Sequence, residues 1–318
     1  MNRFTQLNHQ TIVSTSIAFQ NRKLALLSKN ARLRNIRIKT GIIIENFFFN
    51  VCEKLSVDAL VECGAHDGSI SVKFCGDNTE KYAISFEANP FVVERFSSTI
   101  INKNIQYLNF GLAKTPGILQ LNIPSHSPKS WTPQSSFNRN LTFNEFSQID
   151  VKVDTLDNLI SQYFFKPISV NKAIWIDVEG FGWEVLNGAT NLLSSQMYPI
   201  IFMEVQDQAV WENERNASEI CEYLENYGYV PVVRDCPLAN LYNIVFVKKE
   251  FVDQISELIN IYWLDFASIK PGFYEKKSLR TQIGNIKKKI ILTSPNFSKK
   301  YMHKIFAKLG SRSSKDFE

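Results

Sequence analysis

Residues 58–68 read DALVECGAHDG, an apolar run followed by a turn with glycine at positions 64 and 68. A short run that is apolar throughout is typical of a strand buried on both faces of a parallel sheet. Glycine lets a ligand approach the backbone closely, and the start of a helix at Ser69 would favour polar or anionic groups. The stretch therefore predicts a strand, a ligand-binding turn and a helix. Many folds contain such a turn, so it does not name the ligand.

The same alternation of strand and helix continues along the chain. Because strands that are apolar throughout alternate with amphipathic stretches, we expect an α/β fold with a doubly wound, mostly parallel seven-stranded sheet. The turn-like Asp235-Cys236-Pro237 predicts a C-terminal antiparallel hairpin at the edge of that sheet. The expected strands are 58–63, 82–87, 105–110, 173–177, 200–205, 229–234 and 241–248, and the expected helices include 91–101, 156–163, 183–193 and 217–227.

The composition is that of a globular protein. Hydrophobic residues make up 44% of the 318 residues and charged residues 21%, which is ordinary for a chain with a sizeable core. No apolar run approaches the roughly 18 residues that span a bilayer, and no secretory signal pattern opens the chain. The five cysteines are irregularly spaced and include no C-x-x-C pair. Reduced thiols in a cytoplasmic protein are the interpretation we expect.

Charge is concentrated at the two ends. Residues 1–50 contain eight Lys or Arg and one acid, and residues 270–318 contain thirteen and three, whereas the middle of the chain is acidic. We expect basic helical extensions at 1–50 and 251–318 around an α/β domain at 51–250. The extensions would bind an anionic membrane surface or a protein assembly, or would only be solvated. The protein would then be cytoplasmic, with membrane-peripheral binding left open. Nucleic acid is disfavoured because no recognition motif accompanies the lysines.

Residues 114–150 interrupt the alternation, because they are rich in Pro, Ser and Asn. A long polar insertion in an α/β domain is usually a lid or a binding loop, and disorder is the alternative. His126 and Trp131 within it would be able to reach an acceptor molecule.

A carboxylate follows the second predicted strand. Glu87 lies 23 residues after Gly64, the spacing at which nucleotide-binding sheets present an acid to ribose hydroxyl groups. Asn89 and Pro90 then begin a helix, and Glu87 could instead serve only that helix start. The glycine turn and the acid together predict a nucleoside ligand, which could still belong to NAD or to S-adenosylmethionine.

Two further carboxylates, Asp177 and Glu179, follow the fourth predicted strand in WIDVEGFGWEVLNGA, residues 175–189. In open α/β sheets, this edge holds the ligand crevice. Here the sequence resembles the FkbM family of methyltransferases. The family's D-x-G-A-x-x-G, F-E-P-N-P and K-I-D-V-E-G-x-E-x-x-V-L-x-G-A are similar to 62–68, 86–90 and 175–189, and VDTLD at 153–157 and FMEV at 202–205 agree as well.

The resemblance implies a Rossmann-like class I methyltransferase fold, S-adenosylmethionine as cofactor, and usually an oxygen acceptor on a sugar or a secondary metabolite. The chain departs from the family pattern at three places. Trp175 stands where the family has Lys, which leaves the mode of acceptor binding open. Gly182 stands where the family has its second acid, which falls one position later at Glu184. Glu62 replaces the opening Asp, and either carboxylate can accept from the cofactor's amino group.

On this basis we assign the candidate site residues. Asp177 is the first candidate for the base that removes the acceptor's proton, Glu179 is the second unless it caps the next helix, and Glu204 would complete the acidic site. No metal ligand is assigned, although such acids can hold a divalent cation. His66 would be a base or would pack near the cofactor. The expected cofactor-binding residues are Glu62, Gly64, Ala65, His66, Gly68, Glu87 and Asn89.

Two other functions compete with methyl transfer. An NAD-dependent oxidoreductase would use the same nucleotide scaffold, but the Asp-Val-Glu-Gly strand end and the closing hairpin favour a methyltransferase. A scaffold protein would keep the fold without turnover and dock through its basic ends. Trp175 in place of the family's Lys keeps this second alternative open.

Overall fold

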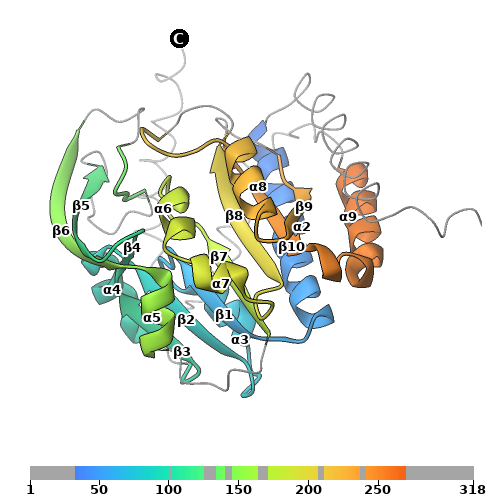
Figure 1. Cartoon of the computed structure of the whole chain (residues 1–318), viewed down its shortest axis with the longest axis horizontal. Helices are drawn as coiled ribbons and strands as arrows, with labels where there is room; N and C mark the ends of the chain where they lie inside the picture. The colour runs from blue at the N-terminus through green and yellow to red at the C-terminus, as the bar shows by residue number, and fades with distance from the viewer. Residues whose placement is uncertain are drawn as a thin grey trace, which may run out of the picture. The chain divides into compact units, whose positions relative to one another are not determined.

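The computed structural model describes residues 33–100, 102–124, 134–139, 145–163, 171–206, 211–236 and 241–269, and helices and strands are labelled as in Figure 1. The candidate acceptor residues His126 and Trp131 lie outside these ranges. So do most of the two basic end segments, at 1–32 and 270–318.

Seven strands form the main sheet, in the order β3-β2-β1-β7-β8-β10-β9. The first five pair in parallel, as their apolar sequences predict. The chain moves outward from β1 to β2 and β3, and later returns to the other side of β1 at β7. A ligand crevice is expected where the strand order reverses in this way. The strands are β1 Val57–Cys63, β2 Tyr82–Glu87, β3 Ile105–Asn109, β7 Asn171–Ile176, β8 Ile200–Gln206, β9 Tyr229–Arg234 and β10 Leu241–Lys248.

The C-terminal antiparallel hairpin at the edge of the sheet is confirmed. β10 pairs antiparallel with both β8 and β9. It therefore lies inside the sheet, and β9 forms the edge. The sequence spacing predicts that the two strands pair, but it does not predict which of them joins the sheet.

Helices cover both faces of the sheet, which gives the doubly wound α/β architecture. Apolar residues of α2, α3 and α9 pack on one face, and those of α5, α6, α7 and α8 pack on the other. Figure 1 shows α2 and α8 on opposite sides of β8. The helices are α2 Leu33–Lys54, α3 Ser69–Cys75, α4 Pro90–Phe96, α5 Leu156–Tyr163, α6 Gly182–Asn187, α7 Thr190–Ser194, α8 Ala217–Glu225 and α9 Ser256–Ser268.

The prediction of a single helix at 183–193 is wrong, because the chain forms two helices there, α6 and α7. The break falls at Gly188, whose carbonyl oxygen accepts a hydrogen bond from Asp157 N at 2.9 Å. A Cβ at Gly188 would lie 2.3 Å from the carbonyl oxygen of Ala113. Close packing against a neighbouring segment therefore interrupts the helix.

A second, smaller sheet occupies part of the polar insertion. Its strands are β4 Gly111–Leu112, β5 Gly117–Pro124 and β6 Phe146–Asp154, in the order β4-β6-β5. β5 and β6 pair antiparallel over eight positions, and Leu121, Ile123 and Val151 form a small core of their own. The described parts of 114–150 are thus largely a folded sheet rather than a loop. Whether the insertion acts as a lid stays a prediction.

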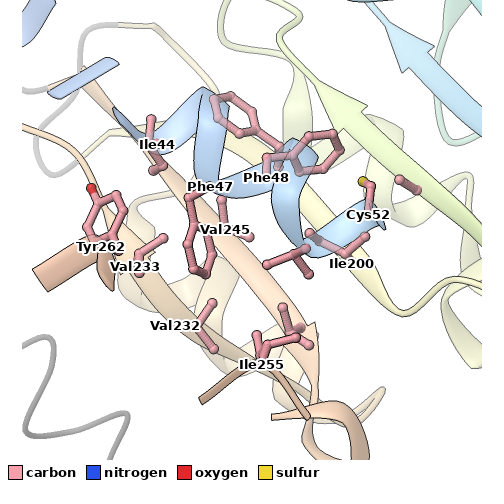
Figure 2. Packing of buried hydrophobic residues seen from close by; sticks show 14 of the residues in the cluster. Ile44, Phe47, Phe48, Cys52, Ile200, Val232, Val233, Val245, Ile255 and Tyr262 are labelled. Atoms are coloured by element: carbon pink, nitrogen blue, oxygen red, sulfur yellow. The ribbon is translucent and has the colours of Figure 1, made fainter. Parts of the chain in front are cut away.

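Helix α2 belongs to the core of the fold. Phe47 and Phe48 are buried against strands and helices of the sheet's α2 face, as Figure 2 shows. The ring of Trp175 stacks on Phe202 with centroids 3.5 Å apart, and Phe48 meets Trp175 edge-on at 5.2 Å. The residue that replaces the family's Lys is therefore an apolar packing residue beneath α2.

Helix α2 crosses the domain boundary expected at residue 50, and α9 follows the boundary expected at residue 250. That division stays a prediction. Among the described residues, no helix combines the length and the hydropathy that crossing a bilayer requires.

Candidate active site

The turn after β1 is bent tightly around the ends of two other strands. Gly64 and Gly68 have φ angles of +81° and +70°, and His66 between them has +45°. The amides of Gly64 and Ala65 both donate to the carbonyl oxygen of Phe86 at the end of β2, at 2.9 and 3.0 Å. A Cβ at Gly64 would lie 1.9 Å from the backbone oxygen of Asp177. Only glycine can pass this close to the end of β7.

Glu87 connects β2 to this turn. One carboxylate oxygen accepts from the backbone N–H of His66 at 2.8 Å, and the other accepts from Asn89 N, also at 2.8 Å. Burial raises the pKa of Glu87, while the two backbone donors lower it. Asn89 caps α4 by accepting from Phe91 N at 3.0 Å. Asn89 therefore caps the helix, the role that was the alternative for Glu87. Glu87 instead binds the glycine turn.

A pocket opens between the turn and the small sheet. Four of the predicted site residues lie on its wall: Gly64, His66, Glu87 and Glu179. The lining also includes residues that were not predicted to bind a ligand, namely Phe86, Ala88, Phe110, Gly111, Leu112, Leu121, Ser135, Ser136, Phe137 and Val178.

Part of the unpredicted wall comes from the insertion, at residues 134–139. Ser136 Oγ donates to the carbonyl oxygen of Glu179, and Asn138 Nδ2 donates to that of Gly180. Phe137 packs on Phe181 with ring centroids 5.2 Å apart. The segment is thereby fixed to the turn after β7. Phe110, by contrast, is the last residue of a predicted strand, so its place at the same sheet edge could have been inferred.

Several predicted residues lie outside the pocket lining. Ala65 and Gly68 belong to the turn, where Gly68 N donates to the carbonyl oxygen of Ala65 at 2.7 Å. Asn89 stands beside the pocket, and its Nδ2 donates to Ser135 Oγ at 3.1 Å. His66 faces Phe96 with ring centroids 5.2 Å apart, which agrees with the packing alternative. The roles of all these residues stay predictions.

Glu62 is buried beneath the turn. One of its carboxylate oxygens accepts from Ser71 Oγ at 2.5 Å and from Ser85 Oγ at 2.8 Å. Burial raises the pKa of Glu62 to about 7, against the lowering effect of the two serines. The unfolded chain releases this proton near pH 4.5, whereas the native protein keeps it to about pH 7. Between these values the native state binds more protons, so stability falls as the pH rises.

This difference predicts the pH dependence of Glu62→Gln. The amide mimics the protonated acid and does not ionise. As pH rises, the variant's free energy of unfolding should therefore increase relative to that of wild type. The gain should be about 3 kcal/mol between roughly pH 4.5 and pH 8.5. Urea denaturation at several pH values measures it, with the exposed Glu94→Gln as control. Parallel stability curves for Glu62→Gln and wild type would contradict the prediction.

Three carboxylates gather where β7 and β8 end. Asp177 N donates to the carbonyl oxygen of Cys63 at 2.9 Å, so Asp177 lies directly beside the turn. Burial raises the pKa of Asp177 and of Glu179, and the neighbouring acids raise that of Glu179 further. Burial and Asp177 raise the pKa of Glu204 to about 8. Carboxylates with raised pKa values are suited to accept a proton near neutral pH.

Glu179 adopts a left-handed backbone, with φ of +50°. Helix α6 has no side-chain cap at its N-terminus, so Glu179 does not have the capping role that was its alternative. Glu214 instead accepts from Trp183 N at 3.2 Å in the first turn of that helix. Within the described ranges, no three His, Cys, Asp or Glu side chains are grouped so that they could hold a metal ion.

Comparisons with known proteins agree with this geometry. The family model described as "Methyltransferase FkbM domain" matches residues 62–231, which include the glycine turn, Glu87 and the three acids. A search of curated proteins found no match.

Several solved structures are similar at low identity. A precorrin-6y C5,15-methyltransferase from Geobacter metallireducens is 14% identical with a TM-score of 0.35, over 62% of this chain and 84% of that one. Magnesium protoporphyrin IX methyltransferase from Synechocystis is 9% identical with a TM-score of 0.36, over 78% and 100%. The N-terminal domain of EvdMO1, solved with SAH and D-fucose, is 10% identical with a TM-score of 0.37, over 64% and 81%.

These scores are too low to add to the argument, so the assignment relies on the family match. That match covers more than half of the chain. The chain belongs to the FkbM family of S-adenosylmethionine-dependent methyltransferases.

Proposed function

We propose that this protein transfers a methyl group from S-adenosylmethionine to a hydroxyl group of a sugar, a glycan or a related hydroxylated metabolite. The observation that carries the proposal is one pocket whose wall includes Gly64, Glu87 and Glu179. The family membership names the donor, and the acids at the ends of β7 and β8 favour an oxygen acceptor, because a hydroxyl must lose its proton as it attacks.

The pocket suits the nucleoside part of the cofactor. Gly64 lines the pocket, and the absence of a side chain lets its backbone lie there while it packs against the end of β7. The Glu87 carboxylate lines the pocket, where its remaining lone pairs can accept from ribose hydroxyl groups. Phe110 and Phe137 add apolar surface for a planar ring. When bound, the sulfonium of the cofactor supplies an activated methyl group.

The protein's own contribution is to orient the acceptor and to accept its proton. Asp177 and Glu204 are the residues we propose for this step. Glu179, which lines the pocket, interacts electrostatically with both of them. Positioning of the two reactants can supply roughly 7–11 kcal/mol of the barrier reduction. A carboxylate that accepts the proton adds about 10²–10⁴-fold.

Isothermal titration with S-adenosylhomocysteine tests the cofactor half of the proposal. We expect saturable binding to the wild-type protein. Glu87→Ala should weaken it about 100-fold, or roughly 3 kcal/mol, because a charge-assisted hydrogen bond to the ligand is lost and His66 N–H loses its acceptor. The exposed Glu80→Ala is the matched control. Equal affinities for Glu87→Ala and wild type would remove Glu87 from the cofactor site, and the absence of saturation in wild type would overturn the proposal.

The acceptor half needs a transfer assay. The protein is incubated with S-adenosylmethionine that carries a labelled methyl group and with glycans released from cells that lack the protein. Mass spectrometry should locate the label on an oxygen of a sugar or a hydroxylated metabolite. A label on nitrogen or carbon would contradict O-methylation. Cofactor binding without any transfer to such extracts would favour the scaffold function instead.

A further inference from the structure

Helix α2 brings one cation to the acidic ends of the central strands. The Arg37 side chain is 17% exposed and forms an ion pair through Nη1 with Asp235, which is fully buried. Its other terminal nitrogen, Nη2, lies 3.7 Å from Glu204 Oε2. One guanidinium therefore joins the carboxylate that follows β9 to the carboxylate at the end of β8. Arg37 lies outside the residues 62–231 that match the family.

Asp235 fixes the orientation of this guanidinium. Its two carboxylate oxygens accept from the N and Nδ2 of Asn243, at 2.8 and 2.9 Å. Asn243 is directly opposite Glu204 in the register of β10 and β8. Paired residues of adjacent strands point to the same face. Glu204, Asn243 and Asp235 thus lie side by side on three neighbouring strands, on the face that α2 covers.

The contact also holds α2 in place. The buried Thr40, one turn along from Arg37, accepts a hydrogen bond from Cys236 N at 3.1 Å. Arg37 Nη1 itself donates to the carbonyl oxygen of Cys236 at 3.4 Å. Because the strand end is bound at two points of the helix, the position of Nη2 beside Glu204 is set by the fold rather than by a flexible side chain.

The groups around Glu204 determine how strongly Arg37 affects its protonation. Asp177 after β7, Glu179 in the following turn and Asp235 after β9 are all acidic, and Asn243 on β10 is neutral. Among the residues that the structure describes, Arg37 on α2 is the cation that interacts with Glu204. Asp177 and Asp235 raise the pKa of Glu204, whereas Arg37 lowers it. Without Arg37, a carboxylate among like charges in a buried site would hold its proton more tightly, so a smaller fraction of it would be ionised and able to accept a proton near neutral pH.

We infer that Arg37 is a positioning residue of the acceptor side of the site, which orients Glu204 and favours its ionised form, the form that can accept the acceptor's proton. The inference rests on the proposed function. It makes α2 part of the functional site, although Arg37 lies outside the segment that carries the family's motifs.

The test is a titration of the Glu204 carboxyl by ¹³C NMR, with its signal assigned from Glu204→Gln. Arg37→Met should raise the pKa of Glu204 so that its proton affinity increases tenfold or more, and Arg37→Lys should restore part of the difference. Asp235→Asn should act in the opposite direction, because it removes a negative neighbour and leaves the guanidinium to Glu204. Lys39→Met, an exposed cation on the same helix, is the matched control.

A purely structural role of Arg37 would give a different result in these titrations. If Arg37 only holds α2 on the sheet, both Arg37→Met and Asp235→Asn would lower the melting temperature while the pKa of Glu204 stayed as in wild type, and the inference would be overturned. If Arg37→Met does not fold, the opposite signs expected for Arg37→Lys and Asp235→Asn decide the question.

Cofactor binding separates this inference from the proposed function. Arg37 does not line the pocket, so Arg37→Met should bind S-adenosylhomocysteine within about twofold of wild type. A wild-type protein without such binding would overturn the proposed function whatever the titration shows. In the transfer assay, the pH profile of Arg37→Met should shift to higher pH by as much as the pKa of Glu204 does in the NMR titration. An unshifted profile would exclude Glu204 as the base.

Discussion

Replacing Gly64 by alanine is expected to lower the free energy of unfolding by about 5 kcal/mol, at the upper end of single-residue effects. The new Cβ would lie 1.9 Å from the backbone oxygen of Asp177, and backbone cannot move aside as a flexible side chain can. The φ of +81° adds strain for any residue with a Cβ, of roughly 1–2 kcal/mol. Since native proteins are stable by only about 5–15 kcal/mol, the variant should be close to unfolded.

Thermal melts and urea denaturation measure this loss, and S-adenosylhomocysteine titration shows whether the remaining folded protein keeps its pocket. Gly117→Ala is the control, because no atom lies within 4 Å of its added Cβ. Its stability should stay within about 0.5 kcal/mol of wild type. A Gly64→Ala protein as stable as Gly117→Ala would show that the turn does not pass as close to β7 as described.

Phe48→Ala should cost about 4 kcal/mol, the usual range for emptying a buried aromatic site. Phe48 is fully buried and makes edge-on ring contacts with Trp175 and Phe202, with centroids 5.2 and 5.9 Å away. Figure 2 shows it on α2 among the residues that fill this side of the sheet. The cavity left by alanine cannot close easily, because the stacked pair Trp175 and Phe202 is held by the strands.

Ile42→Ala on the same helix provides the comparison. Its side chain is 55% exposed, so the change should stay within about 0.5 kcal/mol. Denaturant titration of both variants distinguishes a helix that is part of the core from one that is merely attached. Equal midpoints for Phe48→Ala and Ile42→Ala would mean that α2 does not share the cooperative unfolding of the sheet.

The main sheet could be predicted because its strands are apolar over their whole length. The run at 58–63 became β1, and 82–87 became β2 without a change of bounds. Such strands are buried on both faces, so local composition already reports their environment. The glycine turn and Glu87 were found for a related reason, since both directly follow a predicted strand and must lie at the same edge of the sheet.

The small sheet was missed because its composition resembles a loop. Prolines and serines dominate 114–150, but Ile149, Val151 and Val153 alternate with polar residues in β6. That period of two is the signal of a half-exposed strand. The composition of the insertion as a whole concealed this alternation in β6.

Arg37 and Phe137 could not be predicted from the sequence. Arg37 meets Asp235, which is 198 positions along the chain, only because α2 packs across β8 and β10. Phe137 reaches the pocket because Ser136 and Asn138 bind the turn after β7. Neither position carries a local pattern, since both depend on which elements the finished fold brings together.

The place of β10 inside the sheet has a consequence for synthesis on the ribosome. Residues 229–234 leave the exit tunnel before 241–248, yet they can join the sheet only through the later strand. Until then, the hydrogen-bonding edge of β8 faces solvent, the situation in which newly made chains associate with one another. Chains that end before residue 248 should therefore aggregate more readily than chains that contain β10, because β10 covers the edge of β8.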